Sequence, residues 1–312
     1  PESLEVGDLD ELWAVVGEHL PEHFDEGHAV SCLARAAELG LRSAGGSDSP
    51  GGLQQLVEAL REPLQTGRLQ PSSLARLASA VADISLTDSG LIAELAVQTQ
   101  SRATEFGALE AAVLARALAN LGRPDALASL LDGVADRAPA IGSRALAGIV
   151  WAAASARLRD VAGGSGALDA CIDEAAQRGD RLKPQALANL VWAMGALRKR
   201  REPALRALLP HVVDRSRDMA PQGLANSLWA LAALRPKSRV GGSASAPPGW
   251  LEEDAVLRLS IQALRKIEDF NPLELAGLAR ATATYASAGT RGADFAPLSA
   301  AILGEATKSP QR

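Results

Sequence analysis

The sequence has few cysteines and no long apolar run. Its only cysteines are Cys32 and Cys171 among 312 residues. They lie about four repeats apart in the array described below, so we expect no disulfide between them, which fits a reducing compartment. The longest uncharged run, Met219 to Leu234, has 16 residues. A membrane span needs about 20 apolar residues. We therefore expect a soluble protein with no membrane insertion, and no secretory signal is visible in the acidic first residues.

Motifs of catalytic and metal sites are also missing. The sequence contains no phosphate-binding glycine loop, no dinucleotide-binding glycine turn and no Gly-x-Ser-x-Gly elbow. His19 and His23 are four residues apart, but Pro21 separates them and no His-Glu-x-x-His pattern is present. We expect a protein that is not an enzyme, with no cofactor, no metal site and no small-molecule substrate.

One phrase occurs twice. PQALANLVWAMGAL spans Pro184 to Leu197, and PQGLANSLWALAAL spans Pro221 to Leu234, at an offset of 37 residues. A fixed period of this length is typical of a repeat protein, in which each unit buries its apolar face against its neighbours.

The period extends along the chain. Its anchor is a Leu-Ala pair with Trp five residues after the Leu, as in Leu187 with Trp192. Equivalent anchors, of which that at Val30 is the weakest, are Val30, Leu74, Leu109, Leu146, Leu224 and Leu275. The offsets of 41 before Leu187 and 51 after Leu224 are explained by the inserts at 163–166 and 236–249.

These patterns predict an all-α fold, an α-solenoid of about seven helix-turn-helix repeats with a period of about 37 residues. Residues 1–27 are expected to be a capping region with a helix near 8–20, which is either a terminal cap or the second helix of a truncated repeat, and 28–308 form the array. The expected repeats lie near 28–66, 71–104, 107–139, 143–180, 184–218, 221–268 and 272–308. Each first helix is rich in alanine and nearly uncharged, so we expect it to be buried on most sides. The second helices are amphipathic, and no segment alternates as a strand would.

Charge is distributed unevenly along the chain. Residues 1–156 hold 10 basic and 21 acidic residues, net −11, whereas 157–312 hold 22 and 16, net +6. Within 178–266 the balance is 16 against 7, net +9. The basic surface is therefore local to the C-terminal half.

Two groups of side chains are candidates for RNA contact. The first is the amides Gln185, Asn189, Gln222 and Asn226, which are four apart on one helical face in consecutive repeats. Such amides either hydrogen-bond base edges or form an interior ladder that fixes the register between repeats. The tryptophans Trp151, Trp192 and Trp229 are expected to be packing residues, with base stacking as the alternative.

The second group is cationic. It consists of Arg198, Lys199, Arg200, Arg201, Arg206, Arg235, Lys237 and Arg239. Because Arg198 and Arg235 are equivalent in the repeat, a cationic stripe that contacts phosphates is one interpretation. The other is that cations at helix C-termini interact with the helix dipole.

The two copies at 184–197 and 221–234 resemble the octotricopeptide (OPR) repeat, and are similar to heptatricopeptide and FASTK/RAP-type repeats. Pro247-Pro248-Gly249-Trp250 keeps part of the Pro-Pro-Pro-Glu-Trp run of the OPR signature. No RAP-like module follows the last repeat. The resemblance implies an RNA-binding solenoid in the mitochondrial matrix, or alternatively the plastid stroma, that acts in RNA processing, RNA stability or translation. The RNA would be organellar rRNA or mRNA, held within a ribonucleoprotein.

An architectural role is the alternative. The acidic N-terminal half would repel a phosphate backbone that ran the full length of the chain, so it favours contacts with proteins. In that case the protein is a subunit of an organellar ribosome or another large assembly.

Overall fold

A computed structural model describes residues 7–19, 25–42, 51–158, 165–235, 250–287 and 295–308. Every regular element in these ranges is a helix, which confirms the all-α prediction. None of the helices in the described part is long and apolar enough to cross a membrane. His23, Lys237, Arg239 and the Pro-Pro-Gly of 247–249 lie outside the described residues.

The helices fall into two compact units. The first unit holds α1 (Leu9–His19), α2 (Glu26–Glu38), α3 (Gly51–Gln65), α4 (Pro71–Ile84), α5 (Ser89–Ser101), α6 (Ala108–Asn120) and α7 (Pro124–Ala135). The second unit holds α8 (Ser143–Ser155), most of α9 (Ser165–Gln177), α10 (Pro184–Leu197), α11 (Glu202–Asp214), α12 (Pro221–Leu234), α13 (Trp250–Arg265), α14 (Pro272–Ser287) and α15 (Ala296–Lys308). Short 3-10 turns precede α8, α10, α12 and α14, among them η4 (Ser216–Asp218).

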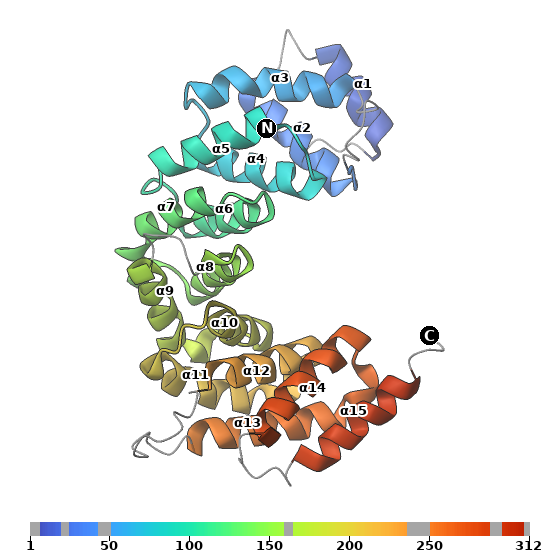
Figure 1. The fold of residues 1–312 in the computed structure, drawn as a ribbon. Helices are drawn as coiled ribbons and strands as arrows, with labels where there is room; N and C mark the ends of the chain where they lie inside the picture. The colour runs from blue at the N-terminus through green and yellow to red at the C-terminus, as the bar shows by residue number, and fades with distance from the viewer. Residues whose placement is uncertain are drawn as a thin grey trace. The chain divides into compact units, whose positions relative to one another are not determined.

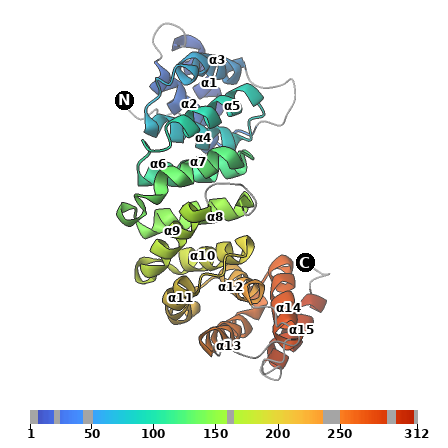
Figure 2. The same cartoon turned by 60° about the vertical axis from the view of Figure 1, so that its left-hand side comes forward.

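Within each unit, helices pack on their equivalents in the next pair, as in an α-solenoid. In the first unit α4 lies between α2 and α6, and α5 lies between α3 and α7. In the second unit α8, α10, α12 and α14 pack in sequence order, and α13 lies between α11 and α15 (Figures 1 and 2). First helices therefore contact first helices, and second helices contact second helices, so each repeat completes the core of its neighbours.

Local signals set the ends of the first helices. Proline occupies the first position of α4, α10, α12 and α14, where its missing N–H costs little. Asn271 caps α14: its Oδ1 accepts from the Glu274 N–H at 2.9 Å, and its own N–H donates to Glu274 Oε2 at 3.0 Å. The observed bounds of α10 and α12 coincide with the two repeated phrases.

The repeat register differs from the predicted one in α6. Leu109 was the expected anchor of that repeat, but its side chain is 74% exposed at the second helical position. Leu74, Leu146, Leu187 and Leu224 occupy the fourth position of their helices and are fully buried. The fourth position of α6 is Ala111, which is also fully buried. The prediction was wrong by two residues because leucine was taken as the anchor where a small residue fills the site.

Small residues let the first helices approach closely. A Cβ added to Gly195 of α10 would lie 2.6 Å from Cα and 2.7 Å from Cβ of Ala230 in α12. Contacts this short do not occur between real side chains, so the backbone spacing here depends on glycine. The close approach of α10 and α12 at this point therefore requires a residue without a side chain.

A basic residue just after each of the five second helices α5, α7, α9, α11 and α13 closes its repeat. In each helix pair, this side chain donates to a backbone carbonyl near the start of the pair's first helix. The acceptor is the buried residue just before the N-cap of that helix. The donor and acceptor pairs are Arg102 to Leu69, Arg137 to Phe106, Arg178 to Ile141, Arg215 to Leu182 and Lys266 to Met219. Each bond satisfies a carbonyl in a buried turn and places a cation at a helix C-terminus, and both effects are stabilising. We call this set the closing cations.

Candidate nucleic-acid interface

Three tryptophans form a row on consecutive first helices of the second unit. Trp151, Trp192 and Trp229 each occupy the ninth position of their helix, in α8, α10 and α12. All three are partly buried, which is compatible with the packing role expected from the sequence and leaves part of each side chain accessible. The rings of Trp151 and Trp192 have centroids 6.4 Å apart at an interplanar angle of 38°. The row therefore combines aromatic packing between repeats with partial exposure of each tryptophan.

The predicted amides lie beside this row. Gln185 and Gln222 are exposed at the second helical position, and Asn189 and Asn226 are half-buried at the sixth. Positions two, six and nine share one face of a helix, so the amides and the indoles form a continuous surface. We call it the tryptophan face.

The amides of α10 hydrogen-bond to each other. Gln185 Nε2 donates to Asn189 Oδ1 at 3.1 Å within the same helix. The bond given to Asn189 thus stays inside its own repeat and does not fix the register with the next one. The exposed Gln185 amide retains further donor and acceptor capacity that faces solvent.

Three cations of the predicted cluster have carboxylate partners. Lys199 Nζ lies 2.9 Å from Asp169 Oδ1, and Arg201 Nε donates to Asp173 Oδ1 at 3.1 Å. Arg200 Nη2 donates to Glu252 Oε1 at 2.7 Å, and its Nη1 donates to the Leu234 carbonyl at 2.9 Å. Asp169 and Asp173 lie on α9 and Glu252 on α13, so these cations tie three repeats together. Their charge is already matched, which leaves less of it for phosphates.

The pKa values follow these contacts. Hydrogen bonding to Asp173 raises the pKa of Arg201 above its ordinary value. For Arg200, desolvation lowers the pKa, but hydrogen bonding and attraction to Glu252 and Glu202 outweigh it, so the net direction is upward. Both guanidinium groups are held in their charged form by acidic neighbours.

Arg198 is different because it is exposed and its backbone is left-handed. Its φ is 53°, and the equivalent Arg157 has a φ of 56°. Glycines Gly40 and Gly122 occupy the same position of other repeats with φ of 85° and 66°. A non-glycine residue in this conformation costs about 1 kcal/mol relative to glycine. In the second unit, Arg157 and Arg198 therefore occupy a left-handed position at which glycine would have less backbone strain.

The remaining predicted cations have varied surroundings. Arg206 is exposed on α11. The Arg235 guanidinium lies over the Tyr285 ring, 5.3 Å from its centroid. Burial is the main cause that raises the pKa of Tyr285 well above its ordinary value. Arg235 thus contributes a cation–π contact between α12 and α14.

Sequence reasoning missed two exposed cations at the ends of α8. Arg144 stands at the second position of α8, equivalent to Gln185, and Arg157 follows the C-cap of the same helix. The spacing of 41 residues from Arg157 to Arg198 was available as a signal, because it is the offset already found between these two repeats. Exposed cations therefore lie at both ends of α8 and at the C-terminal end of α10.

Comparison with models of known protein families gives no match for this sequence, and no curated protein matches it. The described residues also contain no group of three or more side chains suited to hold a metal ion.

Proposed function

We propose that the protein binds single-stranded RNA along the tryptophan face of α8, α10 and α12. The observation that carries the proposal is the alignment of partly exposed tryptophans with amides that are exposed or partly exposed at equivalent positions of α10 and α12. Indole faces stack on unpaired bases, and amides hydrogen-bond to base edges. In single-stranded RNA both the ring faces and the hydrogen-bonding edges of the bases are accessible.

Electrostatic attraction would come from exposed arginines, not from the paired cluster. Arg144, Arg157 and Arg198 are exposed at the ends of the same helices. Each phosphate contact that releases a counterion adds to the salt dependence of binding. Lys199, Arg200 and Arg201 instead hold the repeats in register through their carboxylate partners.

The resemblance to OPR-type repeats supports a role in organellar gene expression. We propose that the protein is a non-catalytic, RNA-holding component of a ribonucleoprotein in the mitochondrion, with the plastid as the alternative. The RNA would be an organellar rRNA or mRNA.

The test is the affinity of the purified chain for fluorescent oligouridine and oligoadenine, measured by anisotropy at several salt concentrations. The variant Trp192→Ala should weaken binding by roughly 1 to 3 kcal/mol, the range for loss of one stacked base. Trp192→Phe should recover part of the affinity, because phenylalanine keeps an aromatic face. Arg201→Ala serves as the control for a paired cation and should change affinity little. RNA affinity that is absent, or unchanged in Trp192→Ala, would contradict the proposal.

An architectural role remains the second candidate, and the acidic charge of residues 1–156 favours it. That half would contact proteins of a larger assembly while the second unit held RNA. Co-sedimentation with ribosomal particles at moderate salt, before and after nuclease treatment, tests it. A chain that remains free of particles under all conditions would argue against this role.

A further inference from the structure

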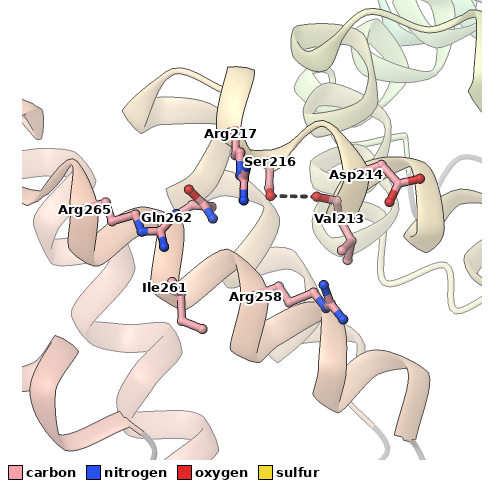
Figure 3. A pocket seen from close by; sticks show the side chains of 8 residues that line it. All are labelled: Val213, Asp214, Ser216, Arg217, Arg258, Ile261, Gln262 and Arg265. Carbon is pink, nitrogen blue, oxygen red and sulfur yellow. Dashed lines mark hydrogen bonds between the residues drawn. The ribbon is translucent and has the colours of Figure 1, made fainter.

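A groove in the second unit lies on the side of the second helices. It has a volume of about 320 Å3 and lies between the end of α11, η4 and the C-terminal half of α13. Its lining residues are Val213, Asp214, Ser216, Arg217, Arg258, Ile261, Gln262 and Arg265 (Figure 3). None of them is on a first helix, so the groove is separate from the tryptophan face.

The wall formed by η4 is held in place by two contacts. Ser216 Oγ donates to the Val213 carbonyl at 2.7 Å, as Figure 3 shows. Lys266, one of the closing cations, donates to the Arg217 carbonyl at 2.7 Å. The backbone that carries Arg217 is therefore fixed against α13, which reduces the entropy lost when a ligand is bound.

The charges of the groove are unevenly matched. Arg258 pairs with Asp254 on its own helix at 2.9 Å. Within the described part of the chain, Arg217 and Arg265 have no acidic partner within salt-bridge distance and are exposed. In Figure 3, Arg217, Gln262 and Arg265 gather at one end of the groove, and Arg258 lies at the other. Two unmatched guanidinium groups beside a side-chain amide suit a carboxylate, which Arg binds with two parallel hydrogen bonds.

The apolar lining residues of the groove are Val213 and Ile261. Ile261 lies on α13 between Arg258 and Arg265 in sequence and is 41% exposed. An RNA backbone offers phosphates to the arginines but no aliphatic group to cover the apolar lining of the groove. An amphipathic peptide helix that carries acidic residues beside an apolar face offers both, and burial of its aliphatic surface favours binding.

We infer that this groove docks an acidic, amphipathic segment of a partner protein. Carboxylates of the segment bind Arg217 and Arg265, and an apolar side chain of the segment covers Ile261. The inference does not depend on RNA binding, because it uses the second helices alone. With both activities, the second unit would hold RNA on its first helices and a protein on its second helices.

The experiment uses the full chain and a short fluorescent helical peptide with leucine on one face flanked by glutamate. Two further peptides are compared: one of the same composition whose leucines do not share a face, and one with lysine in place of glutamate. The expected result is salt-sensitive binding of the first peptide only. The double variant Arg217→Glu with Arg265→Glu should weaken it by about tenfold or more and should gain affinity for the lysine peptide.

Two more variants separate charge, packing and folding. Arg206→Glu is the matched control, since it reverses an exposed charge on α11 outside the groove and should leave binding unchanged. Ile261→Ser should weaken binding without changing its salt dependence. Circular dichroism of each variant shows whether the helices are retained.

Other occupants would give different results. Peptide affinity that is equal in Arg217→Glu with Arg265→Glu and in Arg206→Glu would overturn the inference. Loss of oligouridine affinity in Arg217→Glu with Arg265→Glu, but not in Arg206→Glu, would also overturn the inference and would assign the groove to RNA. Self-association of the chain that the same variant abolishes would assign it to a second copy, through the acidic N-terminal half.

Discussion

Gly195 and Gly148 lie in neighbouring first helices but in opposite surroundings. A Cβ at Gly195 would meet the backbone of Ala230, whereas nothing lies within 4 Å of a Cβ at Gly148. Gly195→Ala should therefore lower the free energy of unfolding by roughly 1 to 3 kcal/mol through overpacking. Gly148→Ala should raise it by about 0.5 to 1 kcal/mol, since alanine is the better helix former. Urea denaturation of both variants checks the pair, and equal effects would contradict the close approach of α10 and α12.

The left-handed arginines allow stability and function to be separated. Arg198→Gly should stabilise the fold by up to about 1 kcal/mol by relief of backbone strain. The same change should weaken RNA binding, because an exposed cation is lost. Thermal unfolding and anisotropy on one preparation measure both quantities. A variant that is destabilised would show that the side chain of Arg198 contributes to packing.

The two cysteines predict a response to alkaline pH. Burial raises the pKa of Cys32 and Cys171 to about 11, from an ordinary value of 9.0. Because the pKa is higher in the folded state, the stabilising contribution is complete below pH 9 and is lost as pH rises toward 11. Native protein at pH 8 should resist thiol reagents, and labelling should follow unfolding. Rapid labelling without loss of helicity would contradict the burial of both thiols.

At the scale of elements, the closing cations set how each helix pair is joined to the preceding turn. Arg215 donates to the carbonyls of Leu182 and Gly179, at the start of its repeat. Arg215→Ala should cost roughly 1.5 to 3 kcal/mol, the range for hydrogen bonds to a charged group. Hydrogen exchange should increase at the start of α10. Arg206→Ala, an exposed cation on the same helix, should leave exchange there unchanged.

The elements also show which features were accessible from sequence. The bounds of α10 and α12 follow from their prolines and from the 37-residue period, because both signals are local. The anchor of α6 was misplaced because Ala111 fills a site that leucine fills in other repeats. Leu109 and Ala111 are both apolar, so the sequence does not show which of them occupies the buried anchor position of α6.

At the scale of the whole molecule, contacts between nearest neighbours should keep damage local. Each repeat packs mainly on the repeats beside it, so a perturbed pair affects its neighbours most. In Gly195→Ala, hydrogen exchange should rise in α10 and α12 and remain unchanged in α2 to α5. A uniform rise along the chain would indicate a single cooperative core.

The sequence by itself determined the helical class, the repeat period and the bounds of the two clearest first helices. These depend on short-range periodicity and on residues that start or end helices. Only the tertiary structure decided that the tryptophans are partly exposed, that Lys199, Arg200 and Arg201 are paired, and that a groove lies between α11 and α13. The pairs join residues 28 to 52 positions apart. Such distances are set by how far and at what angle one repeat lies on the next, and a count of charges along the chain does not contain that information.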